Sequence, residues 1–186
     1  MRVVPLFMSM SLDGFVADRD RRPIALFPDL ENLRNTPALA EMIEATGAVL
    51  MGRRSYEMGD TEEGYVEYEH QVPIFVVTHR VPNEPAKHDP GKGLSFTFVN
   101  DGVESAVEQA RDAAREKDVQ VIGGAQLAQQ LIAADLLDQI NLSLLPVLMG
   151  EDLRLYEHLG SEQRQLEKIK SIDSVERTDI RYRVVK

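Results

Sequence analysis

Cysteine is absent from this sequence of 186 residues. Its absence excludes disulfide scaffolds, thiolate zinc sites and cysteine nucleophiles together. Long apolar segments are also absent, because no stretch approaches the roughly 20 apolar residues of a membrane-spanning helix. The apolar run at the N-terminus is interrupted by Ser9, Ser11 and Asp13, so it lacks the length of a signal-peptide core. These absences predict a cytoplasmic protein that does not associate with a membrane.

Positive charge is scarce in this sequence. Its 21 Lys and Arg residues are outnumbered by 31 Asp and Glu residues, which gives a formal net charge of −10. A nucleic-acid-binding surface needs clustered Lys and Arg to displace counterions, so no nucleic-acid partner is expected. Any phosphate that the protein binds must therefore meet a local cationic site. The four histidines, at positions 70, 79, 88 and 158, lack metal-ligand spacing, so no metal is expected either.

The rest of the composition is typical of a soluble globular protein, with 43% hydrophobic and 28% charged residues. A chain of this length buries roughly two-thirds of its unfolded surface in one domain, so residues 1–186 are predicted to form a single domain. Short apolar runs alternate with segments of helical period, which predicts an α/β fold with a largely buried sheet. The predicted strands run from Val3 to Met8, Ala48 to Met51, Ile74 to Thr78, Ser95 to Val99, Val119 to Ile122 and Ile140 to Val147.

Three helices are predicted between these strands. The first has Thr36 as its N-cap and Pro37 in its first turn, and it ends at Gly47. The second follows a capping box formed by Asp101 and Glu104. The third occupies residues 125–134, directly after a pair of glycines.

The remaining segments are predicted to be a hairpin and loops. Residues 166–174 and 177–185 alternate loosely between apolar and charged side chains, which predicts an antiparallel hairpin at one edge of the sheet. The polar segments 60–70 and 83–93 are predicted to be surface loops. Tyr65 and Tyr68 are therefore expected at the surface, with a lid over the substrate as the alternative.

Three predicted strands end in residues that suit a phosphate group. They are Gly123 and Gly124 after one strand, Arg53, Arg54 and Ser55 after a second, and Thr78, His79 and Arg80 after a third. The glycines allow close approach of a ligand to the backbone, and arginine binds phosphate through paired, charge-assisted hydrogen bonds. Each group also has a plainer explanation, either a tight turn or a solvated positive turn. Because ligands of open α/β sheets gather at the carboxyl ends of strands, the coincidence favours a binding site.

Four segments, in order along the chain, resemble the motifs of a known family. They are Ser11 to Ala17, Gly52 to Glu57, Val121 to Gly124 and Pro146 to Gly150. Taken alone, Asp13 and Gly14 in the first segment indicate only a turn. Together the four segments resemble the dihydrofolate reductase superfamily and, within it, the reductase domain of the riboflavin-biosynthesis deaminase-reductases.

The resemblance implies a dihydrofolate reductase-like, three-layer α/β/α fold. Its sheet would be mixed and mostly parallel, with about eight strands and a C-terminal antiparallel hairpin. The resemblance also implies NADPH as the cofactor and a homodimer as the assembly. The cofactor-binding positions carried over are Val16, Ala17, Gly52, Arg53, Arg54, Ser55, Thr78, His79, Arg80, Ile122, Gly123, Gly124, Ala125, Gln126 and Leu127.

Within that site, the resemblance places the pyrophosphate at the glycine pair and the 2′-phosphate among the arginines. Val16, Ala17 and the loop before them would lie beside the nicotinamide. The candidate catalytic residues are Asp13, Asp29 and Ser143. Asp29 could instead be a helix residue favoured by the helix dipole.

The reaction implied by the resemblance is hydride transfer to a carbonyl or imine carbon of a small heterocyclic or sugar-phosphate substrate. The activity would be most like that of 5-amino-6-(5-phosphoribosylamino)uracil reductase. The zinc ligands of the fused deaminase are missing from the sequence, so only the reductase domain is expected. The alternatives are a dihydrofolate or pterin reductase and a non-catalytic NADPH-binding module.

Overall fold

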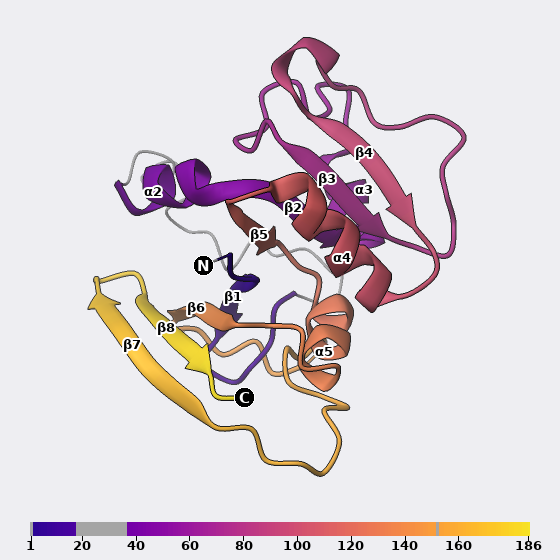
Figure 1. The fold of residues 1–186 in the computed structure, drawn as a ribbon. Helices are drawn as coiled ribbons and strands as arrows, with labels where there is room; N and C mark the ends of the chain where they lie inside the picture. The colour runs from indigo at the N-terminus through magenta and orange to yellow at the C-terminus, as the bar shows by residue number, and fades with distance from the viewer. Residues whose placement is uncertain (1, 18–36, 152) are drawn as a thin grey trace.

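An eight-stranded sheet forms the centre of the computed structural model, which describes residues 2–17, 37–151 and 153–186. The strand order across the sheet is β4-β3-β2-β5-β1-β6-β8-β7 (Figure 1). The strands are β1 (Pro5–Ser11), β2 (Thr46–Gly52), β3 (Pro73–Val77), β4 (Ser95–Val99), β5 (Asp118–Val121), β6 (Gln139–Leu145), β7 (Leu166–Asp173) and β8 (Thr178–Val184). All eight strands expected from the sequence are present, although their ends differ by a few residues.

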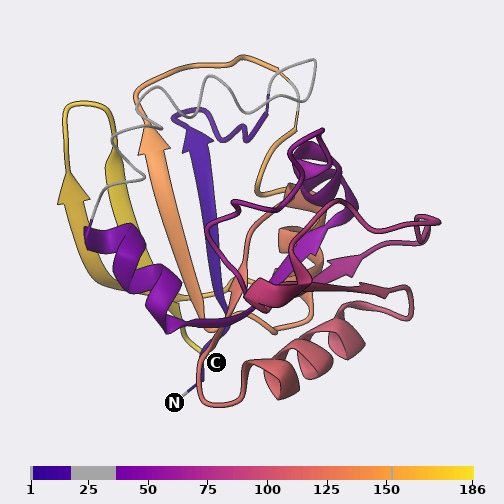
Figure 2. The same cartoon turned by 90° about the horizontal axis from the view of Figure 1, so that it is seen from above.

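The sheet is mixed, as predicted. Six strands run parallel to one another, in the order β4, β3, β2, β5, β1 and β6. Strand β8 pairs with both β6 and β7 in an antiparallel manner. The C-terminal hairpin therefore closes one edge of a parallel sheet. Because parallel strands point the same way, the segments that follow β1 to β5 emerge at one edge of the sheet (Figure 2).

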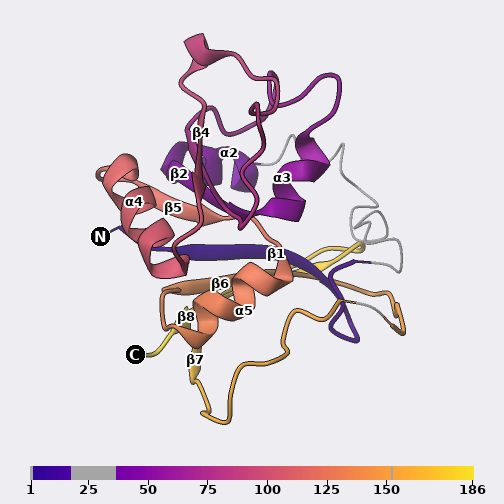
Figure 3. The same ribbon diagram turned by 90° about the vertical axis from the view of Figure 1, so that its right-hand side faces the viewer.

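Helices cover both faces of the sheet, which gives the predicted three layers (Figure 3). They are α2 (Pro37–Ala45), α3 (Arg53–Gly59), α4 (Val103–Ala114) and α5 (Ala125–Ala133), with a short 3-10 helix η2 (Pro90–Lys92) in a loop. On one face, α4 and α5 pack on alternate side chains of the central strands, including Leu6, Leu50 and Val121. On the other face, Tyr56 of α3 packs against Val49.

Helix α4 shows why its sequence folds onto the sheet. Its apolar positions Val103, Ala106, Val107, Ala110 and Ala114 are all buried, as their helical spacing predicts. The small alanine side chains bring the helix close to the sheet. A Cβ on Gly47 of β2 would lie 2.5 Å from the carbonyl oxygen of Ala114, so only glycine fits there.

Two predicted helix boundaries were wrong, and one helix was not predicted. The N-cap of α4 is Gly102, with a φ of 118°, and no side chain caps the helix. Asp101 instead accepts a hydrogen bond from the Ser105 hydroxyl (3.0 Å), so the predicted capping box does not form. Helix α2 ends at Ala45, and Gly47 lies inside β2. The predicted N-cap Thr36 lies outside the described residues. Helix α3 was missed because its sequence is dominated by polar residues.

Candidate functional site

A cleft of about 1430 Å³ opens at the carboxyl ends of the parallel strands. The segments after β1, β2, β3, β4 and β5 all contribute to it, together with the first turns of α3 and α5. The sheet order explains this convergence, because these five strands are neighbours in one parallel block. The cleft is large enough for a dinucleotide, since small-molecule sites typically have volumes of roughly 300–1,000 Å³.

Every position that the resemblance assigned to the cofactor lines this cleft. These positions are Val16, Ala17, Gly52, Arg53, Arg54, Ser55, Thr78, His79, Arg80, Ile122, Gly123, Gly124, Ala125, Gln126 and Leu127. They come from four separate segments of the chain, which the sheet brings together. Their contact with a cofactor stays a prediction.

The glycine pair occupies the short connection between β5 and α5. Gly123 has a φ of +63°, which disfavours any side chain, and the Gly123–Gly124 peptide bond is cis. A Cβ on Gly123 would also lie 3.1 Å from the Ser55 Oγ. Gly124 differs, because it is extended (φ −90°, ψ −175°) and a Cβ there would meet only the Ser55 Oγ, at 3.6 Å. The fold therefore requires glycine at 123, whereas at 124 glycine only keeps the cleft open.

A hydrogen bond joins the glycine pair to the neighbouring strand. The Gly52 N–H donates to the Gly123 carbonyl oxygen (2.9 Å), which fixes the end of β2 against the end of β5. Directly beyond Gly124, α5 begins at Ala125, and the Ala128 N–H makes the first intrahelical bond, to the Gly124 carbonyl. The N–H groups of the first turn before Ala128 have no intrahelical acceptor, as at any helix start. They are available to an anionic group in the cleft.

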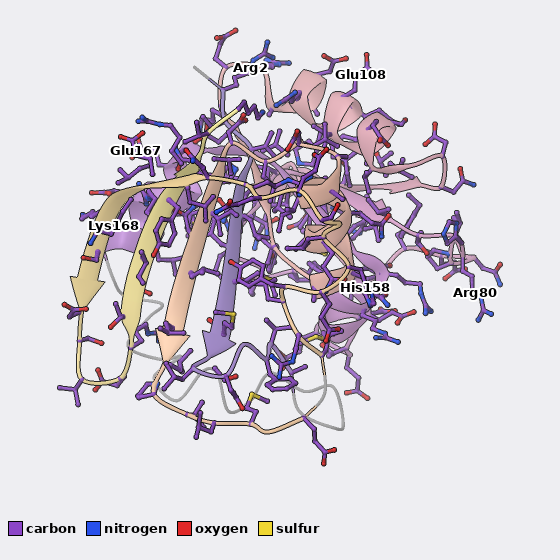
Figure 4. All side chains as sticks on the ribbon, turned by 90° about the horizontal axis from the view of Figure 1, so that it is seen from below. Arg2, Arg80, Glu108, His158, Glu167 and Lys168 are labelled. Carbon is purple, nitrogen blue, oxygen red and sulfur yellow. The ribbon has the colours of Figure 1, made fainter. Side chains whose placement is uncertain are left out.

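The cationic side chains lie at the ends of β2 and β3. Arg53 is paired with Glu57 one helical turn away, at 2.8 Å, and both side chains are exposed. Arg54 and Arg80 are exposed, and Arg80 extends outward at the periphery of the molecule (Figure 4). The cleft therefore has positive groups near its β3 end in a protein of net charge −10.

Thr78 has a different position from the neighbouring cations. It is buried, and its hydroxyl donates to the Arg80 carbonyl oxygen (2.9 Å) while it accepts from the Arg80 N–H (3.0 Å). Its backbone N–H donates to the Val99 carbonyl oxygen. Thr78 thus shapes the turn that presents His79 and Arg80 to the cleft.

Tyr65 is buried, so its expected surface exposure was wrong, whereas Tyr68 is half-buried. Tyr65 is 2% exposed, and its hydroxyl donates to the Tyr56 carbonyl oxygen (2.8 Å). Its ring stacks on that of Tyr56, with centroids 5.9 Å apart, and Tyr68 packs edge-on against it. Burial raises the pKa of the Tyr65 hydroxyl, which therefore stays protonated. Both rings also line the cleft, so the loop that carries them forms part of its wall.

Asp13 does not line the cleft, and its carboxylate is occupied by the protein itself. It accepts hydrogen bonds from the Ser11 hydroxyl (2.6 Å) and from the backbone N–H groups of Met149 (3.1 Å) and Gly150 (2.8 Å). The bond from Ser11, with those from Gly150 and Met149, lowers the pKa of Asp13 to about 2. A group with this pKa is ionised at neutral pH and is a poor proton donor.

Asp13 joins the segment after β1 to the segment after β6. Two backbone hydrogen bonds join the same segments, because the Leu12 N–H donates to the Val147 carbonyl and the Val16 N–H donates to the Leu153 carbonyl. Val16 and Leu153 line the cleft, so this pairing sets one of its walls. The geometry thus favours a positioning role for Asp13 in place of the catalytic role expected from the sequence.

The lowered pKa of Asp13 makes its contribution to stability dependent on pH. Because the pKa is about 2 in the folded protein and 3.8 ordinarily, the contribution is complete above about pH 4 and is lost as the pH falls through about 2. We expect Asp13→Asn to unfold at a lower urea concentration than the parent near pH 6, and the difference to shrink towards pH 2. Paired urea titrations across this range measure it, with Asp173→Asn on the exposed strand β7 as the control. A difference that does not vary with pH would contradict the assignment.

Of the other two candidate catalytic residues, the structure describes only Ser143, which it does not bring to the cleft. Ser143 lies on β6, where its hydroxyl donates to the Asp179 carboxylate on β8, and it is not a lining residue. Asp29 lies outside the described residues. Neither role is therefore tested by the structure.

Comparison with known proteins connects this cleft to a family. The model of the RibD C-terminal domain matches residues 2–178. The chain belongs to the RibD C-terminal domain family. The four sequence segments that carried the predicted resemblance all fall within the matched range. In this family member, three of them, which contain Val16, Gly52 and Gly123, contribute to the lining of the cleft.

One curated relative and two solved structures are similar to this chain. The chain is 22% identical over 163 residues to YwjB of Bacillus subtilis, an uncharacterised protein, with 88% of this chain and 87% of YwjB covered. The deaminase/5-amino-6-(5-phosphoribosylamino)uracil reductase of Thermotoga maritima has a TM-score of 0.70 at 16% identity, and 99% of this chain covers 57% of that one. Dihydrofolate reductase of Enterococcus faecalis, in complex with NADP(H), has a TM-score of 0.61 at 17% identity, with 99% and 97% covered. The fold is therefore dihydrofolate reductase-like.

Sequence reasoning missed several residues that line the cleft. They are Asn100 and Gly102 after β4, Lys87 in a loop, Gln130 on α5 and Leu153. Asn100 and Gly102 follow a predicted strand, so the rule applied to the other strand ends would have found them. Lys87, Gln130 and Leu153 have no such signal, because the tertiary fold alone brings them to the cleft.

No group of three or more His, Asp or Glu side chains among the described residues could hold a metal ion. No helix within residues 2–17, 37–151 and 153–186 is long and apolar enough to cross a membrane.

Proposed function

We propose that the protein is an NADPH-dependent oxidoreductase that transfers a hydride to a carbonyl or imine carbon of a small heterocyclic or sugar-phosphate substrate. Its activity would be most like that of 5-amino-6-(5-phosphoribosylamino)uracil reductase. The observation that carries the proposal is the cleft, in which a bare glycine connection, a helix start and a group of arginines adjoin one another. Family membership supports the same function.

The residues present fit a dinucleotide phosphate in chemical terms. The first turn of α5 offers free N–H groups beside Gly124, which suits a pyrophosphate. Arg54 and Arg80 offer guanidinium groups, which suit the additional phosphate of NADPH. The bound cofactor would supply the hydride. This chain's own residues would bind and orient it and would exclude water from the reacting carbon.

The proposal also includes location and assembly. The protein would act in the cytoplasm on a small-molecule substrate as a single domain. From the resemblance, it would form a homodimer, for which β7 is the candidate contact because every residue of this edge strand is exposed. A proton source for the reduced substrate is still needed.

Two alternatives concern the same cleft. A dihydrofolate or pterin reductase would share the fold of the Enterococcus enzyme and differ only in its substrate. A non-catalytic module would bind the cofactor without consuming it. Cofactor binding is common to every version, and only consumption of NADPH separates an enzyme from a binding module.

The deciding experiment has two steps. The first titrates the purified protein with NADPH and with NADH, following cofactor fluorescence, and we expect saturable binding with a preference for NADPH. The second follows loss of reduced-nicotinamide absorbance with 5-amino-6-(5-phosphoribosylamino)uracil and with dihydrofolate, and we expect turnover with the first compound. Absence of saturable NADPH binding would refute the proposal. Binding without turnover of any substrate would favour the non-catalytic module, and turnover of dihydrofolate alone would favour the folate reductase.

A further inference from the structure

The face of the sheet opposite α5 is polar where it crosses β1, β6 and β8. Along β6, Ile140 and Leu142 belong to the hydrophobic core beneath the helices α4 and α5. Because side chains alternate along a strand, Asn141 and Ser143 lie on the opposite face. Asn141 is only 7% exposed, and neither its amide nitrogen nor its amide oxygen has a hydrogen-bond partner in the structure. This face is therefore not built as a second apolar core.

Two rows of side chains cross these three strands, which lie side by side (Figure 2). Ser9 is in register with Ser143, and Ser143 is in register with Asp179. Residues in register share a face of the sheet, so Ser9, Ser143 and Asp179 form one row. The neighbouring row contains Phe7, Asn141 and Arg181. Ser9 and Phe7 line the cleft, so both rows begin there and extend across β6.

The hydrogen bond within the row fixes the direction in which Ser143 can bind a ligand. The Ser143 Oγ–H donates to the Asp179 Oδ1. A hydroxyl has one proton and two lone pairs, and an ionised carboxylate can only accept. With its proton committed to Asp179, the Ser143 oxygen is left to accept from a further donor. Ser143 and Asp179 are both half-buried, so the row is accessible to a small molecule.

On the basis of the proposed reductase function, we propose that the row Ser9–Ser143–Asp179 recognises the substrate. The Ser143 oxygen accepts a hydrogen bond from an amino or ring N–H group of a planar heterocycle. Asp179 is a positioning residue, because it acts through the Ser143 proton. The carboxylate also disfavours an anionic group at this point of the substrate. The row begins at Ser9, which lines the same cleft as Val16 and Ala17, beside which the nicotinamide is expected.

The experiment compares two uncharged probes that differ in a single group. 6-Aminouracil carries an amino donor where 6-methyluracil carries a methyl group of similar size. Each is titrated into NADPH-saturated protein, and the dissociation constants are measured by NMR. A charge-assisted hydrogen-bond arrangement predicts that 6-aminouracil binds roughly tenfold more tightly than 6-methyluracil.

Three variants test the direction of the hydrogen bond. Ser143→Ala removes the acceptor, so the preference for the amino probe is expected to fall below about threefold. Asp179→Ala frees the Ser143 proton, and the preference is expected to fall similarly. Asp179→Asn keeps an acceptor oxygen for Ser143 and is expected to retain most of the preference. Ser171→Ala and Asp173→Ala, on the exposed strand β7, make the same chemical changes away from the row.

The ratio of the two dissociation constants separates recognition from a structural role. A merely structural Ser143–Asp179 pair would lower the thermal unfolding temperature in Asp179→Ala and leave the ratio unchanged. An unchanged ratio, or no binding of either probe to protein that binds NADPH, would overturn the inference and leave the proposed function intact. Failure of the parent protein to bind NADPH would instead refute the proposed function.

Discussion

Replacing Gly124 with valine is expected to weaken NADPH binding about a hundredfold or more while the protein stays folded. Gly124 lines the cleft in an extended conformation that any residue can adopt, and a Cβ there would meet only the Ser55 Oγ, at 3.6 Å. A branched side chain would occupy the space needed by a phosphate against the first turn of α5. Loss of two charge-assisted hydrogen bonds, at about 1.5–3 kcal/mol each, accounts for a loss of this size.

The measurement is a fluorescence titration of parent and variant protein with NADPH, accompanied by a thermal unfolding curve for each. Gly91→Val makes the same change in the exposed 3-10 helix η2, outside the cleft, and is expected to bind NADPH normally. Retained affinity in a folded Gly124→Val protein would remove the glycine connection from the site. A variant that fails to fold is replaced by Gly124→Ala, for which a smaller loss is expected.

Removing the exposed arginines Arg54 and Arg80 is expected to abolish the preference for NADPH over NADH. Arg54 and Arg80 are exposed at the cleft, whereas Arg53 is already paired with Glu57. In the double variant Arg54→Ala with Arg80→Ala, NADPH affinity should fall about a hundredfold, because two charge-assisted contacts to the 2′-phosphate are lost. NADH affinity should change less than about threefold, because NADH lacks that phosphate.

Parallel titrations with the two cofactors measure this effect, and the ratio of dissociation constants reports it. Arg183→Ala removes one arginine from β8, where it is paired with Glu167, and serves as the control for loss of an arginine away from the cleft. Glu167 lies on the far hairpin from Arg80 (Figure 4). An equal loss for NADPH and NADH would place the arginines at a part of the site shared by both cofactors. An unchanged ratio would remove them from 2′-phosphate recognition.

Alternation of apolar runs was sufficient to predict the sheet. The run from Val119 to Ile122 has three apolar residues out of four and ends at two glycines, which indicates a short strand. The hairpin of β7 and β8 was likewise readable from its alternating pattern. Helix α3 was not readable, because Arg53 and Arg54 open it and Tyr56 is its buried residue. Tertiary packing of that one ring stabilises a segment of weak periodicity.

The site was predicted less evenly than the fold. The strand-end rule and the family resemblance together predicted one site for Gly124, Arg54 and Arg80. The structure brings all three residues to one cleft. The prediction of surface exposure failed for Tyr65, because the sequence around it is acidic and gives no sign of the aromatic cluster that buries it. The catalytic role expected for Asp13 stays a prediction, and the local pattern gave no sign of the hydrogen bonds from Ser11, Met149 and Gly150 to its carboxylate. Contacts between segments distant in sequence cannot be read from local patterns.

The position of β1 in the middle of the sheet has a consequence for synthesis on the ribosome. Leu6 pairs with Val121 on one side and with Ile140 on the other, so the first strand to be made has both of its neighbours in the second half of the chain. The nascent N-terminal strand must therefore remain unpaired until β5 and β6 emerge. Such long-range pairing is slow and leaves apolar segments open to association in the meantime. The cleft is lined by residues of β1 and by residues that follow β5, so it takes shape only late in translation.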